Sequence, residues 1–85
     1  MDGKEREKLD KWVVKDNRLK RSFKFKDFKE SIDFVNKVAG LSESVNHHPS
    51  IIIDYNKVEI VLWTHSEGEV TEKDYNLAGK IDEIQ

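Results

Sequence analysis

Near the start of the chain, hydrophobic residues alternate with polar ones, the pattern of a strand with one buried face. The alternation runs through "RLKRSFKF", which follows a shorter apolar run, "WVV". Asp16 and Asn17 separate the two runs, and both residue types tolerate the left-handed conformations of a tight hairpin turn. We therefore predict a first hairpin. The side chains expected to be buried are Leu19, Phe23 and Phe25, and the solvated face is expected to carry Arg18, Lys20, Ser22 and Lys24.

From Asp27 the hydrophobic period changes to that of a helix. Asp27 followed three residues later by Glu30 matches a helix start, and Pro49 disfavours helical geometry at the preceding residue, which limits the helix end. We therefore expect an amphipathic helix, in which Gly40 is a weak point. Its apolar rows are Phe28, Ile32, Val35 and Ala39, and next to them Phe34, Val38, Leu41 and Val45.

A second hairpin is predicted from "IIIDY" and "VEIVLWT", which are rich in β-branched and aromatic residues. Asn56 and Lys57 fit a two-residue turn, which places Tyr55 opposite Val58. The face toward the helix then pairs Ile53 with Ile60 and Ile51 with Leu62. The other face pairs Asp54 with Glu59, Ile52 with Val61, Ser50 with Trp63 and, if pairing continues past Pro49, His48 with His65. Opposed residues have Cβ atoms about 4.5 to 5.5 Å apart, so this register predicts that two imidazoles meet beside Trp63.

A last helix is predicted from Thr71, where "TEKD" fits a capping box, with Leu77, Ala78, Ile81 and Ile84 on one side. Residues 4–10 are strongly charged and support at most a short helix. Two hairpins with a helix between them and another after them indicate the α+β class. We expect residues 1–85 to form a single domain, a four-stranded antiparallel sheet with helices packed on one face.

Composition narrows the function classes. The chain has 85 residues, a formal net charge of -2 and no cysteine, which excludes a disulfide framework, a thiol nucleophile and a cysteine zinc site. Without a general basic excess, we expect no nucleic-acid partner. No apolar run approaches the roughly 20 residues of a membrane span, and the start lacks the apolar core of a signal peptide, so we expect a cytoplasmic protein without a membrane partner.

All three histidines lie within residues 47–65. Histidine suits general acid or base catalysis because an imidazole gives or takes a proton near neutral pH. Together with nearby carboxylates, the candidate constellation is Glu43, His47, His48, His65 and Asp74. Each member also has a plain structural explanation, since histidines are often inert at surfaces. Glu43 lies one helical turn before His47 and either orients it or is only an exposed helix residue. Asp74 completes a capping box, although a capping carboxylate can also reach an imidazole. A metal site is the rival chemistry, but adjacent histidines on an extended segment point to opposite faces and are poor co-ligands.

The segments "ESVNHHP", "YNKVEIVLWTH" and "TEKDYNLA" together resemble the pterin-4a-carbinolamine dehydratases, a family also known as dimerisation cofactors of a homeobox transcription factor. The resemblance covers most of the chain from Trp12 onward. It implies a saddle-like α+β fold, association as a homodimer or homotetramer, and no metal or organic cofactor. By this resemblance, the five candidate residues fall on the family's active-site positions.

The implied reaction is removal of water from a 4a-hydroxytetrahydropterin to give a quinonoid dihydropterin, with tetrahydrobiopterin as the parent pterin. The resemblance implies that His47 and His65 are the main acid–base residues and that His48 assists at the hydroxyl, while Glu43 and Asp74 orient the imidazoles. Pro49, Thr64 and Ser66 are the implied pterin neighbours. "SIII" and "GEVT" depart from the usual family pattern, which leaves open a modified pterin such as a molybdopterin-related compound. A non-catalytic dimerisation or binding module is the alternative class.

Overall fold

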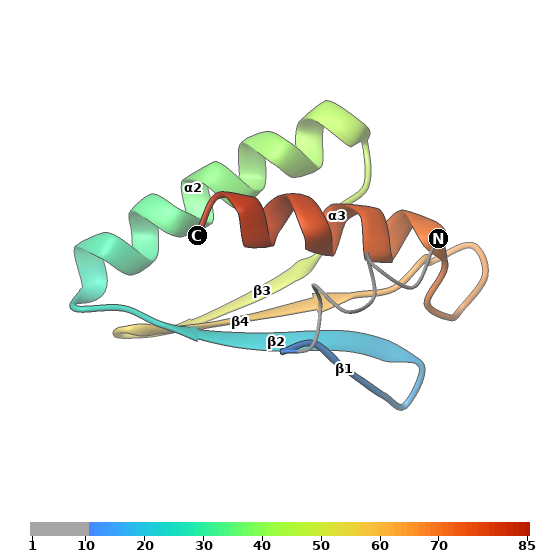
Figure 1. Cartoon of the computed structure of the whole chain (residues 1–85), viewed down its shortest axis with the longest axis horizontal. Coiled ribbons are helices and arrows are strands. Elements are labelled where there is room, and N and C mark those ends of the chain that lie inside the picture. Colours follow the sequence, from blue (N-terminus) through green and yellow to red (C-terminus); the bar gives the residue numbers. More distant parts are fainter. Residues whose placement is uncertain (1–10) are drawn as a thin grey trace.

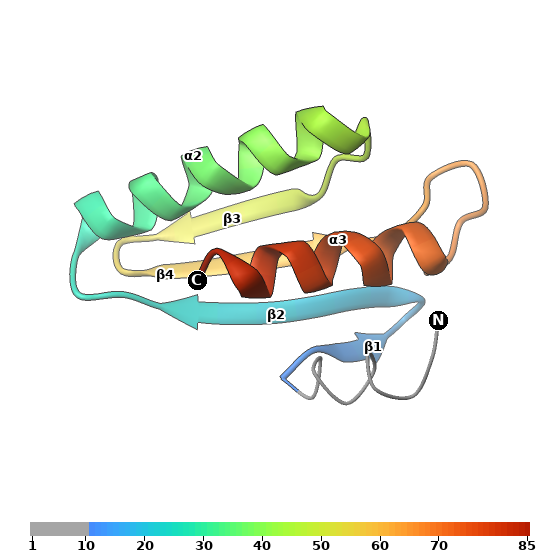
Figure 2. The ribbon, with the colours of Figure 1, turned by 45° about the horizontal axis from the view of Figure 1, so that its top comes forward.

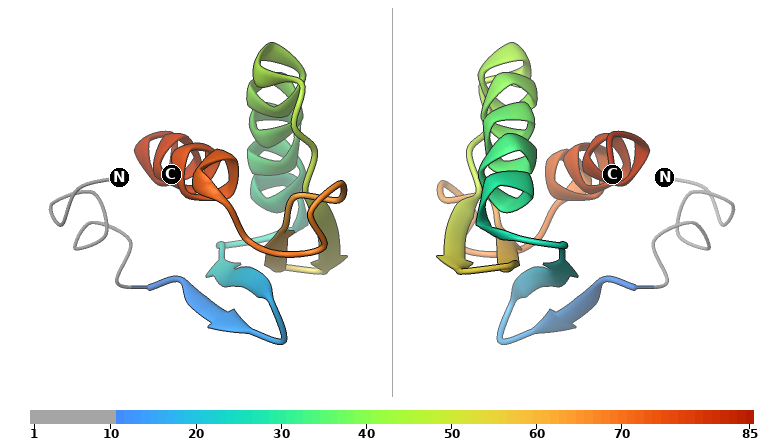
Figure 3. Two further views of the ribbon diagram at one scale, coloured as in Figure 1. Left: turned by 90° about the vertical axis from the view of Figure 1, so that its right-hand side faces the viewer. Right: turned by 90° about the vertical axis from the view of Figure 1, so that its left-hand side faces the viewer.

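Two helices lie on one face of a four-stranded antiparallel sheet in the computed structural model, which describes residues 11–85 (Figure 1). The strand order is β1-β2-β4-β3 (Figure 2), and both helices lie on the same side of the sheet in the end-on views (Figure 3). The predicted α+β class is therefore confirmed, whereas the short helix considered for residues 4–10 lies outside the described residues. The elements are β1 (Val13–Lys15), β2 (Arg18–Lys24), α2 (Phe28–Val45), β3 (Ser50–Asp54), β4 (Lys57–Leu62) and α3 (Glu72–Glu83).

The first hairpin has the predicted turn. Asp16 and Asn17 have φ values of 54° and 58°, the conformation that a tight two-residue hairpin turn requires and that Asp and Asn adopt more readily than most residues. The turn pairs Lys15 with Arg18, and β2 continues alongside β4. Leu19 and Phe23 point to the helices and are buried, as the alternating pattern predicts.

The core lies between the inner face of the sheet and the two helices. Each strand of the central pair contributes alternate residues, and each helix contributes one stripe, so burial follows the periods of 2 and 3.6 in the sequence. Phe23 and Phe34 pack with ring centroids 4.7 Å apart, which ties β2 to α2. The buried apolar residues of this core are Trp12, Leu19, Phe23, Phe34, Val38, Val58, Ile60, Leu62, Leu77, Ala78 and Ile81.

The predicted register of the second hairpin is wrong by two residues. Asp54 pairs with Lys57 and Ile53 with Val58, so the turn is Tyr55–Asn56 rather than Asn56–Lys57. A shift of two leaves every side chain on its predicted face, and hydrophobic alternation therefore does not distinguish the two registers. Contacts with the residue that follows β2 hold the observed turn: the Phe25 N–H donates to the Asn56 carbonyl at 2.8 Å, and Asn56 Nδ2 donates to the Phe25 carbonyl at 3.2 Å.

The buried stripe of α2 lies on only one of its two predicted apolar rows. Phe34 and Val38 are buried, and two serines, Ser31 and Ser42, fill the close-packed positions on the same stripe. Phe28, at the start of the other row, is 51% exposed. Asp27 caps the helix by accepting a hydrogen bond from the Glu30 N–H, as predicted. No helix within residues 11–85 is long and apolar enough to cross a membrane.

One inward position of the sheet holds a charge that the sequence analysis did not single out. Arg21 lies between Leu19 and Phe23 on the inner face, and its Nη1 is 2.5 Å from Asp82 Oδ1. The same carboxylate oxygen accepts a hydrogen bond from Trp12 Nε1 at 2.9 Å. Arg21 also lies over the Phe23 ring, at 4.2 Å from its centroid. These contacts tie the C-terminal turn of α3 to the first hairpin.

Candidate active site

Asp74 is the centre of the candidate site and is fully buried. It is the third residue of α3, where its side chain completes a capping box with Thr71, as predicted. Oδ2 of Asp74 accepts a hydrogen bond from the Thr71 N–H at 2.9 Å, and Thr71 Oγ1 accepts one from the Lys73 N–H at 3.3 Å. The start of α3 thus fixes the position of a buried carboxylate.

His47 lies against this carboxylate, with its Nε2 atom 2.6 Å from Asp74 Oδ1. The imidazole is 14% exposed. It reaches the carboxylate because α2 ends at Asn46 in a left-handed conformation, with φ of 52°, and the His47 N–H donates to the Ser42 carbonyl at 3.1 Å. A residue that follows one helix is therefore held against the first turn of another.

Thr64, two residues after the end of β4, joins the same cluster. Its hydroxyl donates to Asp74 Oδ2 at 2.9 Å, and its oxygen is 2.6 Å from Thr71 Oγ1. The side chain is nearly buried, and the Thr64 N–H donates to the Glu69 carbonyl at 2.9 Å. Sequence reasoning identified Thr64 only as a pterin neighbour and Thr71 only as a cap. The capping box predicted that Thr71 lies beside Asp74, but no sequence pattern placed Thr64 next to them.

His48 and Glu43 form a second, exposed pair. The distance from His48 Nε2 to Glu43 Oε2 is 2.5 Å, and the two side chains are 55% and 76% exposed. The sequence suggested that Glu43, four residues before His47, would orient that histidine. The structure corrects this pairing: the chain turns at Asn46, so Glu43 contacts His48 while Asp74 contacts His47.

His65 lies apart from these pairs. Its ring stacks on Trp63 with centroids 4.4 Å apart and planes 5° apart, and Arg18 lies 4.2 Å from the Trp63 ring centroid. The predicted meeting of His48 and His65 across the hairpin is wrong, because the register is shifted and β3 begins only at Ser50. Sequence reasoning did not identify Arg18 as part of this stack, because the pairing of β2 with β4 that brings Arg18 near Trp63 was not predicted.

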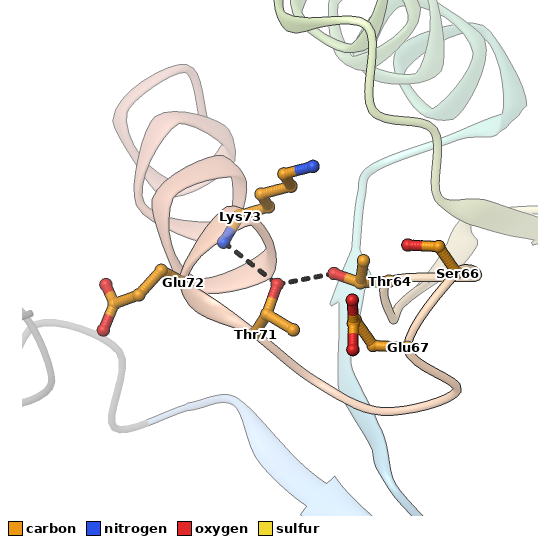
Figure 4. A pocket seen from close by; sticks show the side chains of 6 residues that line it. All are labelled: Thr64, Ser66, Glu67, Thr71, Glu72 and Lys73. Atoms are coloured by element: carbon orange, nitrogen blue, oxygen red, sulfur yellow. Dashed lines mark hydrogen bonds between the residues drawn. The ribbon is translucent and has the colours of Figure 1, made fainter.

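A small open pocket of about 350 Å³ lies beside the Thr64–Thr71 contact (Figure 4). Figure 4 shows Thr64 and Thr71 at its centre, with Ser66 and Glu67 from the following loop on one side. Its volume is at the lower end of the range for small-molecule sites. The pocket therefore includes two of the three predicted pterin neighbours, Thr64 and Ser66. The third, Pro49, is half-buried next to His48 and does not line it.

The metal alternative has no matching arrangement of donors in residues 11–85. No group of three or more His, Cys, Asp or Glu side chains in this part of the chain is arranged to hold a metal ion. The four paired residues instead form two separate histidine–carboxylate contacts. Such contacts fix which ring nitrogen carries a proton, which is the requirement of acid–base chemistry.

Comparison with known proteins gives a consistent result. Residues 3–84 match the model of the family described as pterin 4 alpha carbinolamine dehydratase. A protein of Sulfolobus acidocaldarius, provisionally named a pterin-4-alpha-carbinolamine dehydratase, is 48% identical over 77 residues, which cover 91% of this chain and 85% of the relative. A protein of Picosynechococcus with the same provisional name is 51% identical over 73 residues, covering 86% and 79%.

Solved structures agree with the fold. A crystal structure of a transcriptional coactivator/pterin dehydratase from Brucella melitensis has a TM-score of 0.87 and 40% identity, covering 95% of this chain and 88% of that one. A pterin dehydratase-like protein identified as a RuBisCO assembly factor in the alpha-carboxysome has a TM-score of 0.71 over 86% of this chain. At 24% identity, the second likeness concerns the fold alone.

Proposed function

The chain belongs to the pterin-4a-carbinolamine dehydratase family, and we propose that it dehydrates 4a-hydroxytetrahydrobiopterin by histidine acid–base catalysis. Family membership and relatives at about 48% identity support the dehydration of a pterin carbinolamine. The observation that carries the proposed mechanism is the contact between His47 and the buried carboxylate of Asp74. A buried carboxylate that orients an imidazole is a recurrent device for acid–base catalysis.

The reaction needs two proton transfers. The bond between C4a and its hydroxyl oxygen breaks, the proton on N5 is removed, and the C4a=N5 double bond forms. Because hydroxide is a poor leaving group, an acid protonates the oxygen, and water leaves. Each transfer contributes roughly 10² to 10⁴ in rate when the acid or base is positioned by the protein.

The two histidine–carboxylate pairs suit different roles. His47 is held in the more enclosed position, and we assign it to removal of the N5 proton. His65 is the second acid–base residue, and we assign it to protonation of the 4a-hydroxyl oxygen; its ring is placed by stacking on Trp63. His48 is exposed and bound to Glu43, and we assign it to binding the same hydroxyl. In this scheme Glu43 and Asp74 orient the imidazoles.

The pterin site in this proposal extends from the histidines to the pocket of Figure 4. Thr64 and Ser66 line that pocket and flank His65 in the sequence, so a pterin held there is adjacent to the chain segment that carries His65. Pro49 follows His48 and limits the conformations of that segment. Backbone groups of the loop at residues 65–68 supply further hydrogen-bonding partners for the heterocycle.

The test is the rate of carbinolamine dehydration above the spontaneous reaction. We expect His47→Ala and His65→Ala each to lower kcat by about 10² or more, because each removes a proton-transfer group. Lys20→Ala, on the free face of the sheet, is the matched control and should retain wild-type turnover. Near wild-type rates in both histidine variants would contradict the assignment.

A second candidate function is binding of a protein partner. The Brucella relative is described as a transcriptional coactivator as well as a pterin dehydratase. In this chain, Val13 and Ile52 are exposed on the sheet face opposite the helices, at 58% and 54%. A binding role should survive loss of His47 and His65, whereas dehydration should not, so the same two variants distinguish the functions.

We also propose self-association as a homodimer or homotetramer. An 85-residue chain buries only roughly 60% of its unfolded surface, and association adds apolar burial that a small domain lacks. The partly exposed apolar row of α2 supports this proposal, since Phe28 is 51% exposed at its start.

A further inference from the structure

We propose that Thr64 and Thr71 are positioning residues whose hydroxyls form a one-way chain of hydrogen bonds onto Asp74, and that this chain holds His47 with its proton on Nε2 and its lone pair on Nδ1. The catalytic part of this inference rests on the proposed dehydratase function. The directions of the hydrogen bonds rest on geometry alone.

The chain of hydrogen bonds begins at a backbone N–H, a group that can only donate. The Lys73 N–H points to Thr71 Oγ1 at 3.3 Å, so this hydroxyl oxygen acts as an acceptor. Thr71 Oγ1 and Thr64 Oγ1 are 2.6 Å apart, and Thr64 Oγ1 is 2.9 Å from Asp74 Oδ2. A hydroxyl has one hydrogen to donate. If Thr64 donates its hydrogen to the carboxylate, the contact between the two hydroxyls requires Thr71 to donate to Thr64.

Asp74 is arranged as an acceptor at both oxygens. Oδ2 receives the Thr64 hydroxyl and also the Thr71 N–H at 2.9 Å, and a backbone N–H is an obligate donor. The first turn of α3 adds the positive end of a helix dipole beside this fully buried side chain. These groups favour acceptance of hydrogen bonds by the carboxylate, so the remaining oxygen, Oδ1, accepts from His47.

The tautomer of His47 follows from this direction. Its Nε2 atom, 2.6 Å from Asp74 Oδ1, carries the proton. A neutral imidazole has one protonated and one unprotonated nitrogen, so Nδ1 has the lone pair. In the proposed reaction, Nδ1 of His47 removes the N5 proton, and Asp74 stabilises the imidazolium that results. Thr64 and Thr71 influence this proton transfer only through Asp74, which makes them positioning residues for His47 rather than proton-transfer groups.

Thr64→Val is the decisive substitution, because it removes the hydroxyl and keeps the branched shape of a nearly buried side chain. We expect kcat to fall roughly 10-fold with KM unchanged, since a buried carboxylate loses one hydrogen bond and holds His47 less well. Thr64→Ser keeps the hydroxyl and should restore most of the activity. A raised KM with unchanged kcat would overturn the proposal, because it would show that Thr64 acts only as part of the pterin pocket and not through His47.

Nitrogen NMR of the His47 imidazole tests the proposed chain of hydrogen bonds without an activity measurement. We expect Nε2 to be protonated and Nδ1 unprotonated in the wild-type protein, and a mixture of tautomers in Thr64→Val. Thr71→Val and Thr71→Ser give the same comparison of a lost and a retained hydroxyl, at the hydrogen bond that precedes Thr64. Wild-type protein with the proton on Nδ1 overturns the proposal even if Thr64→Val fails to fold.

The two hypotheses fail in different ways. If the wild-type protein does not accelerate dehydration but His47 is the Nε2–H tautomer and changes in Thr64→Val, the hydrogen-bond chain stands and the proposed function does not. If dehydration is accelerated but Thr64→Val has wild-type kcat and an unchanged His47 tautomer, the function stands and the positioning role is excluded.

Discussion

Among single residues, Arg21 has an unusual position because it places a charge on the inner face of the sheet. Its side chain is 10% exposed and that of its partner, Asp82, is 19% exposed. We expect Asp82→Ala to lower the free energy of unfolding by about 3 kcal/mol, because it leaves a nearly buried guanidinium without its ion partner and Trp12 Nε1 without an acceptor. Denaturant unfolding followed by Trp fluorescence measures this difference.

A second substitution separates the charge from the packing. Adding Arg21→Met to Asp82→Ala removes the uncompensated charge and should recover about 1 kcal/mol. The matched control is Lys29→Ala, which breaks an ion pair whose side chains are 85% and 55% exposed and should change stability by less than about 0.5 kcal/mol. An Asp82→Ala variant as stable as this control would show that the inward pair contributes little.

The sequence indicated which residues form the candidate site but not which of them contact one another. Three histidines and two carboxylates in the right chemical class are visible in the sequence. Their pairing depends on the left-handed turn at Asn46, which sends His47 toward a carboxylate 27 positions away and leaves His48 with Glu43. Residue spacing alone favoured the Glu43–His47 pair, because residues four apart lie on the same face of a helix that continues past Asn46.

At the scale of elements, capping and periodicity predicted most of the fold. The turn at Asp16–Asn17, the start of α2 at Asp27 and the capping box at Thr71 were all predicted, because each depends on a local contact between neighbouring residues. The register of the second hairpin was not, because registers two residues apart bury the same face. The turn at Tyr55–Asn56 is held by Phe25, which lies 31 positions before Asn56, and no local pattern contains that contact.

This turn gives a prediction about local strain. Tyr55 has φ of 53° and is 61% exposed, so an aromatic residue occupies a left-handed conformation while burying little. We expect Tyr55→Asn to raise the free energy of unfolding by about 0.5 kcal/mol, because Asn tolerates this conformation better. Tyr55→Val should lower it, since β-branched residues tolerate it least. Chemical denaturation of the two variants measures both; a less stable Asn variant would contradict the strain argument.

For the whole molecule, the proposed self-association can be assigned to one of two surfaces. On the free face of the sheet, each exposed apolar residue lies opposite a charged one: Ile52 pairs with Glu59, and Val13 pairs with Lys20. On α2, the partly exposed apolar row is uninterrupted by charge and follows the spacing i, i+4, i+7, i+11. The row is Phe28, Ile32, Val35 and Ala39. A continuous apolar row is the better candidate for an interface between identical chains.

Sedimentation of the purified chain tests this assignment directly. We expect a mass of at least twice 10.0 kDa, and we expect Phe28→Lys to shift the distribution toward the monomer, because it places a charge on the most exposed aromatic residue of the proposed contact. Ile52→Lys is the matched control on the other face and should leave the mass unchanged. If Ile52→Lys dissociates the assembly and Phe28→Lys does not, the free sheet face is the interface. That result would also argue against the same face being open to a different protein partner, so the assembly experiment limits the second candidate function as well.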